Sequence, residues 1–150
     1  MYPDGTCPCG LCIKNINNPG QYVNESMSGK TIMVVDDEKS MLVVVKTVLE
    51  PEGFEVITAN SGKECLEMLK KRKPDLILMD MMMPGLSGRD TTEKIRKDKR
   101  TKDIKIAFLT VVSFSETGKE VLRKIGVIDY ITKPFENEEF IKRIRKILGS

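Results

Sequence analysis

The sequence predicts an α/β protein built on a doubly wound, five-stranded parallel sheet. Five short apolar runs alternate with segments of helical spacing, and right-handed crossovers leave few other arrangements for such an alternation. The third run, LILMD at residues 76–80, is almost wholly apolar, which is typical of a strand covered on both faces. In such sheets the functional crevice lies at the carboxyl ends of the strands.

The chain is expected to comprise a tail over residues 1–28 and one domain over residues 29–150. The tail contains Pro, Gly, Asn and Cys without apolar periodicity, so we expect it to be flexible. The strands expected in the domain are residues 31–36, 54–58, 75–80, 104–110 and 127–131.

Helical spacing of apolar residues predicts a helix after the first, second and fifth strands, and weaker patterns fill the other two gaps. The residues that carry the clear patterns are Met41, Val45, Val48 and Leu49, then Leu66 and Leu69, then Phe140, Ile144, Ile147 and Leu148.

Capping residues support these boundaries. Ser61 and Ser87 each precede an acidic residue at capping-box spacing, which predicts that they begin the second and third helices. Asp37 is expected to cap the first helix, and Gly53 and Gly126 suit helix exits.

Three of the four cysteines, Cys7, Cys9 and Cys12, lie together in the tail. Their spacing invites a zinc or redox hypothesis, but a fourth ligand is missing and the sequence has no histidine to supply one. Free thiols are the favoured interpretation, although a dimer could pool cysteines from two chains. Cys65 falls on the apolar side of the second helix and is expected in the core.

The charge balance excludes several classes of function. The 25 Lys and Arg are interspersed with 22 Asp and Glu, so we expect no binding to nucleic acid or to an anionic membrane. No apolar run is long enough to span a bilayer, and a signal-peptide pattern is missing at the N-terminus. The expectation is a soluble, cytoplasmic protein.

Polar residues end four of the predicted strands: Asp36 and Asp37, Asp80, Thr110, and Lys133 just beyond the fifth. Clustered carboxylates repel one another, and oxygen ligands favour Mg²⁺ or Mn²⁺. Each residue also has a plain structural explanation, as a cap, turn former, strand or loop residue. Because all of these residues follow strands whose carboxyl ends meet, they together favour a metal-assisted site that binds or transfers a phosphoryl group.

Four motifs surround the predicted strand ends: VVDDE at 34–38, LILMDMMMPGLSG at 76–88, FLT at 108–110 and DYITKPF at 129–135. Through these motifs the chain resembles the receiver domains of response regulators in two-component signalling. The resemblance covers roughly residues 31–148 and implies a flavodoxin-like (βα)5 fold with strand order 2-1-3-4-5.

The resemblance implies that Asp80 accepts a phosphoryl group from the phosphohistidine of a histidine kinase or phosphotransfer protein, or from a small donor. It also implies that Asp37, Asp80 and the backbone carbonyl of Met82 bind Mg²⁺, that Asp36 holds a metal-bound water, and that Lys133 offsets charge during transfer. The chain is therefore expected to be a phosphoacceptor switch and not an enzyme with turnover.

The switch implied by the resemblance runs from the Thr110 hydroxyl, which binds the phosphoryl group, to Tyr130, which turns from an exposed to a buried rotamer. The surface of helix four, strand five and helix five would then dock a downstream protein. A stand-alone, chemotaxis-regulator-like receiver is the simple expectation, and a piece of a longer protein is the alternative.

Side chains beside the acceptor predict a long-lived phosphorylated state. Met82 and Val112 occupy positions that line the path of attacking water in the family, and neither can orient water. Val111 replaces the small residue usual after the switch threonine, which narrows access further and makes small phosphodonors less effective.

Two other functions compete with a receiver. A Mg²⁺-dependent phosphohydrolase of the haloacid dehalogenase type uses an aspartate nucleophile but has a second Asp two residues later, where this chain has Met82. A flavodoxin-type FMN binder needs a Ser/Thr-rich and Gly-rich phosphate loop after the first strand, where Asp36 and Asp37 would repel the anion.

Overall fold

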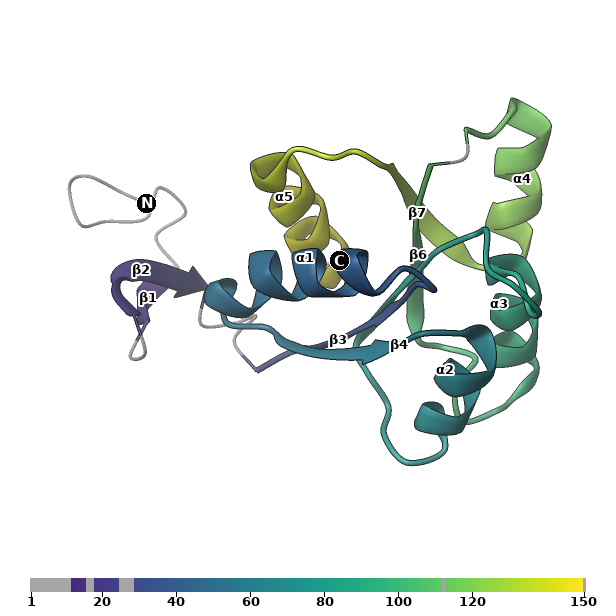
Figure 1. Ribbon diagram of the computed structural model, residues 1–150, viewed down its shortest axis with the longest axis horizontal. Helices are drawn as coiled ribbons and strands as arrows, with labels where there is room; N and C mark the ends of the chain where they lie inside the picture. Colours follow the sequence, from purple (N-terminus) through teal and green to yellow (C-terminus); the bar gives the residue numbers. More distant parts are fainter. Residues whose placement is uncertain (1–11, 16–17, 25–28, 112, 150) are drawn as a thin grey trace.

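The computed structural model describes residues 12–15, 18–24, 29–111 and 113–149 (Figure 1). The elements are β1 (Cys12–Asn15), β2 (Asn18–Asn24), β3 (Thr31–Val35), α1 (Lys39–Leu49), the 3-10 helix η1 (Glu50–Glu52), β4 (Glu55–Ala59), α2 (Gly62–Leu69), β5 (Leu76–Met79), α3 (Gly88–Lys97), β6 (Lys105–Thr110), α4 (Glu116–Lys124), β7 (Val127–Thr132) and α5 (Asn137–Leu148).

Strands β3 to β7 form a parallel sheet in the order β4-β3-β5-β6-β7. Counted along the domain, this is the order 2-1-3-4-5 that the resemblance implied, so that prediction is confirmed. The direction of winding reverses between β3 and β5, and doubly wound sheets bind their ligands at the carboxyl ends of the strands at such a reversal.

Alternating side chains of the sheet enter two separate cores. Ile32 and Val34 pack with residues of α1 and α5, whereas Met33 and Val35 pack with residues of α2, α3 and α4. In Figure 1, α1 and α5 accordingly lie on one side of the sheet and α2 and α3 on the other. Cys65 is fully buried in the second core, as expected.

The ends of α2 and α3 follow the predicted capping chemistry. The Ser61 and Ser87 hydroxyls accept the backbone N–H groups of Glu64 and Asp90, each at 3.1 Å. The predicted cap of α1 is wrong, because the N-cap residue is Glu38 and not Asp37. The chain stays extended for one residue more than expected, and Asp37 joins the acidic cluster described below.

One arginine connects three segments on the α3 side of the sheet. The Arg96 guanidinium donates to the carbonyl oxygens of Lys102 and Ile104, at 2.6 and 2.7 Å. It also donates to those of Ile125 and Gly126, at 3.1 and 2.8 Å. Arg96 therefore ties α3 to the start of β6 and to the junction between α4 and β7.

Strands β1 and β2 pair as an antiparallel hairpin within residues 1–28, the segment expected to be a flexible tail. Strand β2 lies against η1, and Figure 1 shows the hairpin beside the end of α1. Residues 1–11, including Cys7 and Cys9, lie outside the described residues, so the zinc hypothesis and the domain boundary stay predictions. Across the described ranges, the structure has no helix long and apolar enough to cross a membrane.

Candidate functional site

Three carboxylates meet at the carboxyl ends of β3 and β5. The two strands pair in register through Val35 and Met79, so the residues that follow them lie side by side. Asp36, Asp37 and Asp80 each offer an oxygen, and these oxygens lie within 4.8 Å of one another. The Asp36 and Asp80 side chains are buried, whereas Asp37 is exposed to solvent.

The Lys133 ammonium group lies against the two buried carboxylates. Its Nζ is 2.5 Å from Asp36 Oδ2 and 3.7 Å from Asp80 Oδ2, and only 7% of the side chain is exposed. The backbone N–H of Lys133 donates to the Thr110 carbonyl at 2.8 Å, and a cis peptide joins Lys133 to Pro134. One ammonium facing two buried carboxylates and a third nearby leaves an excess of negative charge.

Backbone N–H groups orient the two buried carboxylates. The Glu38 N–H donates to Asp36 at 2.9 Å, and the Met82 N–H donates to Asp80 at 3.2 Å. Burial raises the pKa of Asp80, Lys133 lowers it, and the neighbouring Asp36 raises it further. Neither N–H donor was predicted from the sequence, which implied only that the backbone carbonyl of Met82 binds the metal.

Gly88 is a second feature that the sequence did not reveal. A Cβ atom at Gly88 would lie 2.3 Å from the Asp80 carbonyl oxygen, so only glycine lets α3 begin so close to the acceptor strand. The Gly88 N–H donates to the carbonyl oxygen of Met81 at 2.9 Å, which fixes this close approach. In the sequence, the position of Gly88 directly after the predicted N-cap Ser87 was the feature that could have indicated a close approach at the start of this helix.

The remaining predicted residues lie around the acidic cluster. Thr110 ends β6 and is buried, whereas Met82 and Val111 are 64% and 67% exposed. Tyr130 is half-buried on β7, with its ring 5.8 Å from the Phe114 ring. Val112 lies outside the described residues.

This donor set fits a magnesium ion. Carboxylate oxygens are the ligands that Mg²⁺ prefers, and a divalent cation balances the charge that Lys133 leaves uncompensated. When bound, Mg²⁺ neutralises the charge of a phosphoryl group that approaches an anionic carboxylate. Fold and site together define a domain for Mg²⁺-dependent phosphorylation.

Comparison with known proteins agrees with this class. Residues 32–145 match the response regulator receiver domain family. The phosphate regulon transcriptional regulatory protein PhoB of Pseudomonas aeruginosa is 38% identical over 122 residues, which cover 81% of this chain and 53% of that protein. Protein PilH of the same organism is 34% identical over 118 residues, which cover 79% of this chain and 97% of PilH.

A solved structure of response regulator protein TrrA from Thermotoga maritima, in complex with Mg²⁺-BeF, superposes with a TM-score of 0.67 at 35% identity. The match covers 79% of this chain and 98% of TrrA. The chain therefore belongs to the response regulator receiver domain family of two-component signalling. It spans about half the length of several of the curated relatives that it matches.

Proposed function

We propose that Asp80 is the phosphoacceptor of this receiver domain. The observation that carries the proposal is the buried Asp80 carboxylate at the end of a central strand, with the oxygens of Asp36 and Asp37 within 4.8 Å and the Lys133 ammonium at 3.7 Å. The donor is the phosphohistidine of a histidine kinase or phosphotransfer protein. A carboxylate oxygen forms the new bond to phosphorus as the P–N bond breaks, and the imidazole takes up a proton.

The groups around Asp80 have two roles, which are to bind the cation and to offset the negative charge of the phosphoryl group. Asp37, Asp80 and the Met82 carbonyl would hold the cation, and Asp36 would accept a hydrogen bond from its hydration shell. The Lys133 ammonium already contacts both buried carboxylates. It is therefore placed to stabilise the negative charge that develops on the phosphoryl oxygens during transfer. The same groups support slow loss of the phosphoryl group to water.

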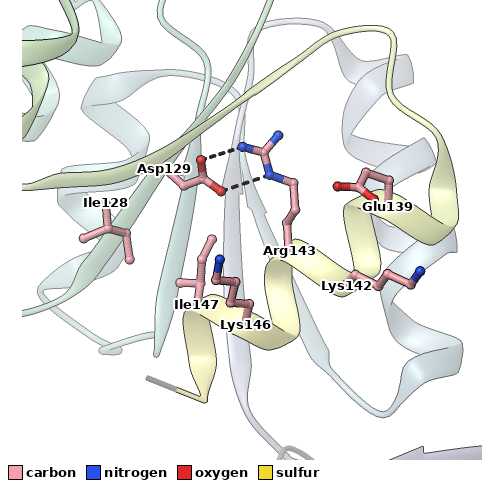
Figure 2. Close-up of a pocket in the computed structure, with 7 residues that line it drawn as sticks. All are labelled: Ile128, Asp129, Glu139, Lys142, Arg143, Lys146 and Ile147. Carbon is pink, nitrogen blue, oxygen red and sulfur yellow. Dashed lines mark hydrogen bonds and ion pairs between the residues drawn. The ribbon is translucent and has the colours of Figure 1, made fainter. Parts of the chain in front are cut away.

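Phosphorylation is read out on the surface of α4, β7 and α5. The Thr110 hydroxyl binds the phosphoryl group, and Tyr130 moves inward from its place between Phe114 and Lys119. A pocket of about 540 Å³ between β7 and α5 belongs to this surface (Figure 2). It includes Ile128, 51% exposed, which is a suitable contact for a downstream protein.

Acetyl phosphate with Mg²⁺, followed by intact mass measurement, tests the proposal. Wild type should gain one phosphoryl adduct, and Asp80→Asn should gain none. Asp103→Asn is the matched control, because it removes an exposed carboxylate at the opposite edge of the sheet. Because the bulk of Val111 is expected to hinder small donors, a phosphorylated phosphotransfer protein serves as a second donor. A wild type that gains no adduct from either donor, or an Asp80→Asn variant that still does, would contradict the proposal.

A further inference from the structure

A second charged region lies at the opposite edge of the sheet from the acidic cluster. The chain segments after α2 and α3 lead into β5 and β6, which are neighbouring parallel strands, so both segments lie at the amino-terminal edge. They carry the runs KKRK at 70–73 and KDKRTK at 97–102. The runs are far apart in the sequence, and the fold brings them together.

Most of the lysines in this region lack a partner. Glu67 pairs with Lys70 at 3.2 Å, and Asp98 pairs with Arg100 at 3.0 Å. Among the described residues, six further lysines of this region are exposed and make no ion pair; these form the α2–α3 lysine patch: Lys71, Lys73, Lys94, Lys97, Lys99 and Lys102. Exposed carboxylates of Asp75 and Asp103 also lie at this edge, but the lysines outnumber them, so the surface here is basic and not evenly mixed.

A small pocket opens within the α2–α3 lysine patch. It has a volume of about 160 Å³ and lies between α2 and α3. Leu66, Leu69 and Ile95 supply the apolar lining, and the polar lining consists of Lys70, Lys94, Asp98, Arg100 and Thr101. Since Lys70 pairs with Glu67 and Arg100 pairs with Asp98, Lys94 is the lining lysine that makes no ion pair with a described residue. The Leu69 and Ile95 side chains are largely buried, so the apolar part of the pocket is a depression and not a protruding surface.

The size and lining of the pocket decide which ligand fits. Pockets for small molecules usually measure about 300–1,000 Å³, so this one accommodates a single aliphatic side chain. None of the described residues that line it is aromatic, so they offer no stacking platform of the kind that single-stranded nucleic acid uses. A membrane surface takes up protruding apolar groups, which a depression does not offer.

We infer that the α2–α3 lysine patch and its pocket dock an acidic segment of a partner protein, one aliphatic side chain of which enters the pocket. The carboxylates that flank this side chain meet the unpaired lysines. The patch lies at the opposite edge of the sheet from Asp80, so a partner can stay bound while the acceptor is phosphorylated. The inference therefore does not depend on the role proposed for Asp80.

A fluorescein-labelled peptide, in which one leucine is flanked by runs of glutamate, provides the probe for fluorescence anisotropy. Wild type should bind it with an affinity that falls as salt is added, because exposed charges are screened. Lys94→Glu should raise Kd about tenfold, since it reverses one charge at the pocket. Lys63→Glu is the matched control, as an exposed lysine at the other end of α2, and should leave Kd unchanged.

A second peptide with serine in place of leucine tests the pocket itself and should bind more weakly than the first. Equal binding of the two peptides, or an equal effect of Lys63→Glu and Lys94→Glu, would overturn the inference. Tighter binding to oligothymidine, or to vesicles rich in phosphatidylserine, would overturn it in favour of a nucleic acid or a membrane. No binding of the leucine peptide at low salt would also overturn it.

Discussion

Replacing Arg96 with methionine should destabilise the domain far more than an ordinary surface arginine change. The variant keeps an aliphatic stem on α3 but removes the guanidinium that donates to four carbonyl oxygens. A buried hydrogen bond from a charged group contributes about 1.5–3 kcal/mol net, and one whose acceptor can bind water instead contributes much less. Arg96 is only half-buried, so several of the four acceptors regain water, and the expected loss in the free energy of unfolding is about 2–4 kcal/mol.

Urea unfolding followed by circular dichroism measures this loss as a lower midpoint with an unchanged slope. Arg89→Met is the matched control, because Arg89 makes an exposed ion pair with Glu93 within one helix. That change should cost less than about 1 kcal/mol. If Arg96→Met and Arg89→Met unfold within about 0.5 kcal/mol of each other, the carbonyl contacts of Arg96 do not stabilise the fold.

A double-mutant cycle with Gly126 sharpens the test. A Cβ at Gly126 would lie 2.6 Å from Arg96 Nε, and the backbone there has a φ of 86°, which favours glycine. Gly126→Ala should therefore cost more with Arg96 in place than in the Arg96→Met background. Additive losses would mean that only backbone strain acts at Gly126.

Four other outcomes are expected. Asp37→Ala should abolish Mg²⁺-dependent phosphorylation with unchanged circular dichroism, because Asp37 is exposed; acceptance at the wild-type rate would show that it holds no metal. Met82→Asn and Val112→Glu should each speed loss of the phosphoryl group by about tenfold, less than the roughly hundredfold of a fully positioned base; equal rates would show that these side chains do not control water. Gly88→Ala should cost about 1–3 kcal/mol in urea unfolding, because its Cβ meets backbone; a wild-type midpoint would refute this. Burial raises the pKa of Cys65 to about 12, so iodoacetamide at pH 8 should alkylate it only after unfolding. Stability should fall above about pH 8.5, where the unfolded thiol ionises first; native alkylation would contradict the burial.

The sequence predicted the sheet and the acidic cluster because both depend on local patterns. The central strands β3 and β5 consist almost wholly of apolar residues, and the aspartate that follows each of them marks the carboxyl edge. The parallel topology then brings Asp36 and Asp80 together without further information. The donors from Glu38 and Met82 could not be predicted, since any residue at those positions supplies the same N–H group.

Helix α3 shows why a weak pattern can still form a packed helix. Its buried face includes Thr91 and Thr92, which an apolar periodicity does not count. Their hydroxyls donate to the carbonyls of Ser87 and Gly88, at 2.8 and 2.7 Å, so burial leaves no hydroxyl unsatisfied. The lysine patch was missed for a related reason, because only the sheet order brings its two runs together.

The division of β3 between two cores limits how this protein can change in length. Loops of the domain can lose or gain single residues. In β3, however, successive side chains point to opposite faces of the sheet, so a shift by one residue exchanges the faces. If the start of β3 stays in place, deleting one residue within the strand reverses the faces of the residues that follow, so Val35 turns toward the core of α1 and α5 and Asp36 moves away from Lys133. Single-residue insertions and deletions in this strand should therefore disrupt both cores, whereas the exposed loops of the domain can change in length without this effect.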